Sequence, residues 1–282
     1  MKLIFLLILF LFIPLGGQSL FTEKDTSNES LETIAQRFPP PEGFQRINIP
    51  SNSFGAWLRK MPLQKAGNPV LDYRGHIHLE SKDTTLAAVT AMDIAGRKLH
   101  QCMDVILRLY AEFQIEKSNI RAIGFPLPDG LRLPLWSWIN GYRPTFRGLH
   151  FRLKRSAGAD SSLKSIQEYL RTIFYYSNTQ TFYHHYKPID RTDLQIGDFI
   201  VKKGKQGHAV LFVDLVQNPD GKMKALVGQG DTPACQFYLL NSDHGSPWIS
   251  LDLTSDALSL PISKKMFWDG LRRFPTIDNT NQ

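Results

Sequence analysis

The sequence predicts an α+β fold in which a buried helix packs on an antiparallel sheet. Helical segments fill much of the first half and strand-like runs the second, an order that argues against alternating βαβ units. Residues 102–113 repeat apolar side chains at the three- and four-residue spacing of a buried helix. The apolar runs 199–201 and 209–213 flank a short polar turn, as neighbouring strands do. With 282 residues and 42% hydrophobic content, the chain can build a sizeable core.

The N-terminal segment predicts export. Residues 3–15 contain no polar side chain and lead into small residues, the pattern of a signal peptide. The run is shorter than the roughly 20 apolar residues of a membrane span. We therefore expect a signal peptide over 1–19, a polar linker over 20–45 and a single α+β domain over 46–282. The mature protein would be secreted or periplasmic, with no stable membrane span after cleavage.

The elements before the buried helix are short. Residues 30–37 and 53–63 favour brief helices, and Pro62 ends the second. Residues 73–79 alternate loosely, as an exposed strand would. The small apolar residues of 84–96 predict a further helix.

The region after the buried helix reads as an insertion of loops and helices. Residues 120–153 are rich in Pro, Gly, Trp and Arg, which predicts short strands, loops and a hairpin that lines a groove. Residues 161–186 favour a helix with Ser162 as its N-cap. A candidate platform for stacking a sugar or a peptide lies in the first part, with ordinary packing as the alternative: Trp136, Trp138, Tyr142 and Arg143.

The net charge of +7 is spread along the chain except for one basic cluster. The cluster consists of Arg143, Arg147, Arg152, Lys154 and Arg155. It suits an anionic wall polymer or lipid headgroups, and the favoured alternative is a solvated loop or edge strand. The chain has no nucleic-acid-binding motif and no repeat, so we expect no nucleic-acid partner.

The candidate chemistry begins with Cys102, in the first turn of the buried helix. Backbone N–H groups at a helix start favour a thiolate, the nucleophilic form of cysteine. His208 starts a hydrophobic strand, where a rigid sheet can aim its ring at such a nucleophile. Gln229 ends the strand that follows, and a polar group there can hold the imidazole in one tautomer.

The hairpin register supports this grouping. Residues 218–221 form a turn signal, and a turn centred on Pro219 and Asp220 makes facing residue numbers sum to about 439. His208 then faces position 231, and both Gln229 and Asp231 fall on its side of the sheet. Gln229 would orient the imidazole as a neutral acceptor, and Asp231 would do so as a carboxylate.

The stretch "DLQIGDFIVKKGKQGHAVLFVD" resembles the NlpC/P60 and CHAP branch of papain-like cysteine peptidases. The resemblance rests on Leu194, Gly197, Asp198 and His208. It implies a papain-like core with Cys102 as the nucleophile, His208 as the base and Gln229 as the orienting residue.

The chain departs from that pattern near Cys102. The Asp-Cys-Ser-Gly surroundings common in NlpC/P60 proteins are replaced by His-Gln-Cys-Met, and the interval between Cys102 and His208 is longer. The inserted loops and helices fill that interval.

The whole chain also resembles the family called domain of unknown function 4846, over roughly residues 45 to 270. The stretches "SFGAWLRKMPL", "GNPVLDYRG", "QCMD" and "GHAV" carry this resemblance, which implies no activity.

Three hypotheses stay open. The first is a secreted cysteine hydrolase, an amidase or peptidase acting on cell-envelope peptide. The second is a non-catalytic module of the same fold that binds envelope glycan or peptide. The third is a structural protein stabilised by a disulfide between Cys102 and Cys235, the only two cysteines. No cofactor is expected, and His76 and His78, although spaced to bind zinc, have no evident third ligand.

Overall fold

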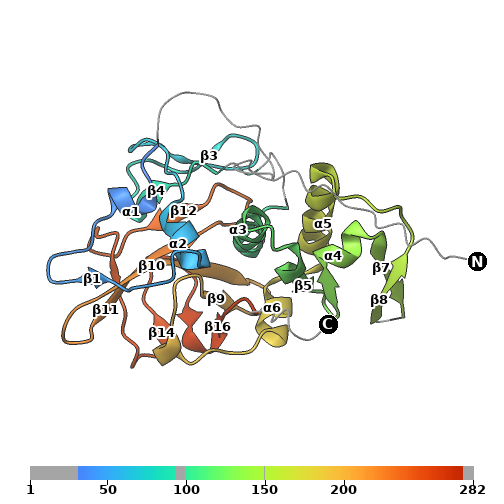
Figure 1. Ribbon diagram of the computed structural model, residues 1–282. Helices are drawn as coiled ribbons and strands as arrows, with labels where there is room; N and C mark the ends of the chain where they lie inside the picture. The colour runs from blue at the N-terminus through green and yellow to red at the C-terminus, as the bar shows by residue number, and fades with distance from the viewer. Residues whose placement is uncertain (1–30, 93, 95–98, 149, 276–282) are drawn as a thin grey trace, which may run out of the picture.

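The computed structural model describes residues 31–92, 94, 99–148 and 150–275. The predicted signal peptide over 1–19 and the first part of the predicted linker lie outside the described residues. Figure 1 shows a sheet with α3 beside it and a group of helices and hairpins beyond α3.

An antiparallel sheet organises the chain. Its strands follow the order β16-β9-β10-β11-β12-β4, while β1 adds to β10 and β13 adds to β11. The strands are β1 (Gln45–Arg46), β4 (Leu86–Val89), β9 (Phe199–Lys202), β10 (His208–Gln217), β11 (Met223–Gln229), β12 (Tyr238–Leu240), β13 (Ile249–Ser250) and β16 (Leu271–Arg272). The α+β class with a large antiparallel sheet is therefore confirmed.

The other strands form four separate hairpins. They are β2 (Val70–Leu71) with β3 (Ile77–Leu79), β5 (Gly124–Pro126) with β6 (Arg132–Pro134), β7 (Tyr142–Arg147) with β8 (His150–Arg155), and β14 (Ala257–Leu258) with β15 (Met266–Phe267). Short strands and a hairpin were predicted for 120–153, and β5 to β8 confirm them.

The helices include four that begin at a favourable capping residue, namely Thr33, Ser53, Ser162 and Asn178. In chain order the helices are α1 (Ile34–Arg37), α2 (Phe54–Arg59), α3 (Cys102–Glu116), α4 (Leu135–Ile139), α5 (Leu163–Tyr176) and α6 (Thr179–His185), with 3-10 turns η1 (Ile120–Ala122), η2 (Arg191–Asp193) and η3 (Trp268–Gly270). Ser162 caps α5 by accepting a hydrogen bond from the Ser165 backbone, as predicted. Across the described ranges, every helix is too short or too polar to span a bilayer.

The sheet separates two apolar clusters. Ala209, Leu211 and Val213 point from β10 into the cluster that contains the stripe of α3. Val210 and Phe212 point to the opposite face. This alternation is the period of two of a strand that is buried on both faces. The predicted packing of a buried helix on the sheet is confirmed, since α3 contacts β10 and β11.

A bulge interrupts β10 between Phe212 and Asp214. Asp214 is fully buried, and its carboxylate pairs with Arg46 and Arg59, each at 2.7 Å. The two guanidinium groups compensate a charge that would otherwise be costly to bury. The pair of arginines therefore holds the bulge to β1 and α2.

Two predictions about the first hundred residues are wrong. Residues 86–89, predicted as part of a helix over 84–96, form β4 and pair with β12 at the edge of the sheet. Small apolar residues suit a helix and a covered edge strand alike, and pairing with β12 decided between them.

The predicted linker over 20–45 does not extend to residue 45. Ile34 is completely buried, and the bridge between Thr33 and Pro62 attaches α1 to the domain. Trp248 also donates a hydrogen bond to the backbone oxygen of Pro39. The described part of this segment is thus folded against the sheet domain.

Candidate functional site

His208 and Gln229 meet across the ends of β10 and β11. The distance between His208 Nε2 and Gln229 Oε1 is 2.6 Å, and both side chains are buried. Leu211 pairs with Gly228, as in the predicted register. The pairs nearer the turn, such as Leu215 with Ala225, are shifted by one residue from the prediction, and the bulge in β10 restores the predicted register. The rigid sheet fixes the distance between the two side chains.

Tyr238 extends the pair into a chain of three side chains. Gln229 Nε2 donates a hydrogen bond of 2.5 Å to the Tyr238 hydroxyl, from β12. Because the amide nitrogen is used there, the amide oxygen faces His208 and accepts from its Nε2–H. His208 is therefore the Nε2–H tautomer, and its Nδ1 presents a lone pair. That Nδ1 is buried and has no hydrogen-bond partner among the described residues.

Cys102 is the first residue of α3, as predicted. Gln101 is the N-cap, and the Asp104 carboxylate accepts a hydrogen bond of 3.0 Å from the Gln101 backbone. The Cys102 side chain is 6% exposed. Its thiol lies beside the backbone amide of Ala209, the residue after His208.

The end of β11 allows this approach. A Cβ atom on Gly230 would lie 3.1 Å from Val105 Cγ1 and 3.6 Å from the Cys102 Cα. The absence of a side chain at Gly230 therefore lets the start of α3 press against the sheet where β10 and β11 stop pairing. No hydrogen bond joins the Cys102 thiol to His208 within the described part of the chain.

Burial sets the protonation of both groups. It raises the pKa of the Cys102 thiol to about 12, reinforced by Asp104 and Asp231, although the amides of Met103 and Ala209 oppose the shift. Burial also lowers the pKa of His208, against the hydrogen bond to Gln229. The helix start was expected to lower the thiol pKa, and desolvation outweighs it. The resting pair is a neutral thiol beside a neutral imidazole.

A cavity of about 700 Å³ opens at the start of α3. Cys102 lines it, together with residues from the ends of α5 and α6 and the turn between β9 and β10. The lining includes Gln101, Tyr175, Asn178, Lys205, Gln206 and Lys264. The cavity is large enough for several residues of a peptide, and Cys102 forms part of its wall.

Asp231 lies close to His208 without bonding to it. Its Oδ1 is 4.0 Å from His208 Nδ1 and 2.9 Å from Lys264 Nζ. Burial alone would raise the pKa of Asp231, but hydrogen bonds from His78 and Lys264 hold it well below its ordinary range. Gln229 rather than Asp231 therefore makes the orienting hydrogen bond. The carboxylate favours a positive charge on the imidazole, but the Lys264 ammonium group that pairs with it opposes that charge more strongly.

The alternatives at the other residues are also resolved by geometry. Cys102 and Cys235 are both free, buried thiols. His78 contacts Asp231, at 3.7 Å, rather than His76. Over the residues that the structure describes, no three metal-ligating side chains cluster.

The four predicted substrate-binding residues separate into two groups. Trp138 is buried, and its indole donates to Ser165 while Arg143 stacks on its ring at 3.7 Å. Trp136 and Tyr142 are exposed. None of the four lines the cavity at Cys102. Trp138 and Arg143 thus serve packing, the alternative left open by the sequence.

Comparison with known proteins identifies the family. A family model described as domain of unknown function (4846) matches residues 34–268. The chain belongs to the domain of unknown function 4846 family. The matched region of this 4846-family chain begins with α1 and includes Cys102, His208 and Gln229. No curated protein and no solved structure matches the chain significantly.

Proposed function

We propose that this 4846-family protein is a cysteine hydrolase that cleaves amide bonds, with a papain-like arrangement of Cys102, His208 and Gln229. The lone pair on His208 Nδ1 supports this most directly. Gln229 is hydrogen-bonded to the other ring nitrogen, Nε2, which holds His208 in one tautomer. The next residue, Ala209, places its backbone amide beside the Cys102 thiol. A buried imidazole with one nitrogen fixed and the other left free is the form needed in a general base.

The neutral resting pair implies a concerted first step. The Cys102 sulfur attacks the substrate carbonyl carbon while its proton moves to His208 Nδ1. The imidazolium then protonates the leaving amine as the carbon–nitrogen bond breaks. Water, deprotonated by the same imidazole, hydrolyses the thioester and restores the thiol.

The substrate proposed is peptide of the cell envelope. The predicted export signal would deliver the protein there, and the cavity at Cys102 has the volume for a peptide segment. Amide side chains and two lysines line this cavity, and these groups suit peptide carbonyls and carboxylates.

The test measures amide hydrolysis of cell-wall peptides by the wild type and by Cys102→Ala. Cys235→Ala is the matched control, because Cys235 is also a buried free thiol but does not line the cavity. We expect activity to disappear in the first variant and to persist in the second. Undiminished hydrolysis by Cys102→Ala contradicts the proposal.

A non-catalytic binding module is the second candidate. The raised pKa of Cys102 and the missing thiol–imidazole hydrogen bond favour it. Such a module would bind wall peptide or glycan saturably, and the Cys102→Ala variant would bind as tightly as the wild type. The wild type would not hydrolyse the bound peptide.

A further inference from the structure

The hairpin of β7 and β8 has two chemically different faces. Cross-strand partners share a face, and Phe146 pairs with Phe151. Their rings lie 4.2 Å apart, and Phe151 lies 5.1 Å from the ring of Tyr176, at the end of α5. This face attaches the hairpin to the rest of the molecule.

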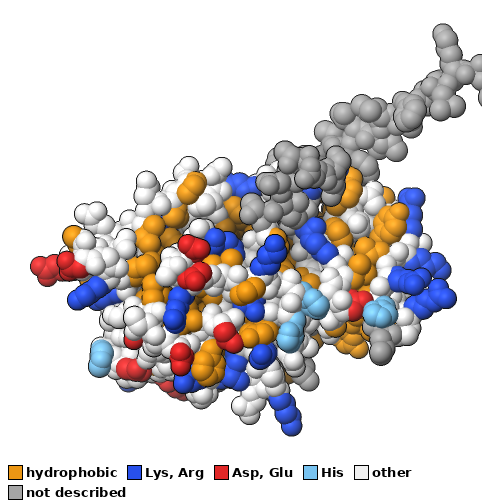
Figure 2. Space-filling view, turned by 90° about the horizontal axis from the view of Figure 1, so that it is seen from below, with side chains coloured by type: hydrophobic (Ala, Val, Ile, Leu, Met, Phe, Trp, Pro, Cys, Tyr) orange, Lys and Arg blue, Asp and Glu red, His pale blue; other side chains and the backbone are white. Residues whose placement is uncertain are grey.

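The opposite face is basic. Its three cross-strand pairs are Arg143 with Lys154, Thr145 with Arg152, and Arg147 with His150. No acidic residue occurs between positions 142 and 155. Residues two apart on a strand are separated by about 7 Å, so the cations form a regular array. Figure 2 shows Lys and Arg side chains together at the right-hand end of the molecule, where Figure 1 places this hairpin.

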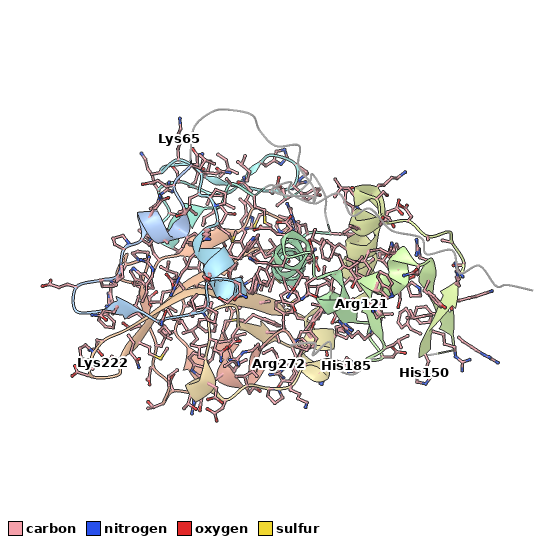
Figure 3. All side chains as sticks on the ribbon, viewed as in Figure 1. Lys65, Arg121, His150, His185, Lys222 and Arg272 are labelled. Atoms are coloured by element: carbon pink, nitrogen blue, oxygen red, sulfur yellow. The ribbon has the colours of Figure 1, made fainter. Side chains whose placement is uncertain are left out.

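Three of these cations have no acidic partner among the residues that the structure describes. Arg143 is occupied by Trp138, and His150 lies 3.9 Å from Asp129. By contrast, none of Arg147, Arg152 and Lys154 forms an ion pair with a described residue, and all three are exposed. Figure 3 shows His150 at the outer end of the hairpin, which therefore projects from the molecule.

Exposed aromatic rings lie on the other face of the hairpin and on the neighbouring helices α4 and α5. Phe146 is 61% exposed and Tyr175 is 69% exposed, and Trp136 and Tyr142 are exposed as well. These four are half of the eight large hydrophobic residues that are exposed in the described chain, and all lie between positions 136 and 175. Apolar side chains next to cations are stabilised at the boundary between lipid headgroups and acyl chains.

We propose that the β7–β8 hairpin docks the domain onto a lipid bilayer that contains anionic lipids. The tip of the hairpin enters first: Arg147, Arg152 and Lys154 contact the headgroups from one face, and the exposed ring of Phe146, next to Arg147, enters the interface from the other face. A soluble polyanion would satisfy the cations but would leave the exposed rings in water. The array and the rings together therefore favour a bilayer over a charged polymer.

The test measures binding of the full chain to vesicles by sedimentation. Two partition coefficients are measured, one for vesicles of equal parts phosphatidylglycerol and phosphatidylcholine and one for vesicles of phosphatidylcholine alone. The readout is the first divided by the second. The apolar segment 3–15 would bind both vesicles and cancels in this ratio. The triple variant R147Q/R152Q/K154Q should lower the ratio roughly 100-fold, at roughly 5-fold per cation.

The matched control is K60Q/K82Q/K222Q, which removes the same charge from exposed lysines of other elements. Its ratio should equal that of the wild type. Phe146→Ala should weaken binding to the anionic vesicles even in high salt, where charge attraction is screened.

Equal ratios for the two triple variants would overturn the proposal. Wild-type binding to soluble polyphosphate together with a vesicle ratio close to one would overturn it too, since a polymer would then be the partner. Circular dichroism of each variant verifies the fold, and Phe146→Ala tests the proposal separately if a triple variant does not fold.

Discussion

The protonation state of Cys102 can be measured directly by alkylation. With a thiol pKa of about 12, the thiolate fraction at pH 7 is on the order of 10⁻⁵ and rises tenfold for each pH unit. Iodoacetamide labelling of Cys102 should therefore accelerate about 100-fold between pH 7 and pH 9. Peptide mapping by mass spectrometry follows Cys102 and Cys235 separately in one sample.

Cys235 is the internal control for access. Burial raises its pKa to about 12 as well, but it does not line the cavity. Its labelling should have the same pH dependence at a much lower rate. A Cys102 rate that stays constant from pH 7 to pH 9 would mean that the thiolate already exists as an ion pair with His208. The neutral resting pair, and the concerted step derived from it, would then be wrong.

Three further predictions concern the proposed hydrolase and its fold. Tyr238→Phe removes the acceptor that fixes the Gln229 amide, so kcat/KM should fall about tenfold with KM unchanged, in a steady-state assay. Burial lowers the pKa of His208, so the acid limb of kcat should have its midpoint below pH 6.5. In the wild type the hydrogen bond from His208 to Gln229 raises this pKa, so Gln229→Leu, which removes the bond, should move the midpoint lower still. Asp214→Ala leaves two partly buried guanidinium groups uncompensated, so urea denaturation should show a loss of about 3 kcal/mol. A midpoint above pH 6.5, or unchanged stability of Asp214→Ala, would contradict the respective argument.

The sequence was most informative where local and long-range signals agreed. The apolar repeat marked the start of α3 at Cys102, and the turn at 218–221 showed that β10 pairs with β11. The bulge at Asp214, which the sequence did not reveal, shifts the pairing by one residue into the register that brings Gln229 to His208. The repeat and the turn both depend on residues within one element or one hairpin. Periodicity and turn chemistry are sufficient at that range.

Other parts of the site depend on contacts between distant elements. Tyr238 reaches Gln229 only because β12 pairs with β11, and nothing in its local sequence distinguishes it from a core tyrosine. The buried state of the Cys102 thiol depends on packing around the helix start, so a rule for helix termini gave the wrong direction for its pKa. Likewise the composition of β4 suits a helix and a strand alike, and only the pairing with β12 makes it a strand.

The bulge at Asp214 separates the site from the hairpin turn. On the site side Leu211 pairs with Gly228, while on the turn side Leu215 pairs with Ala225, a register that differs by one residue. The arginine pair anchors the bulge to elements outside the hairpin. Lengthening the turn at 218–221, or inserting a reporter there, would leave His208 and Gln229 facing each other. The proposed active site is therefore insulated from insertions at this loop, which makes the loop a suitable position for a fluorescent label or for new chain termini.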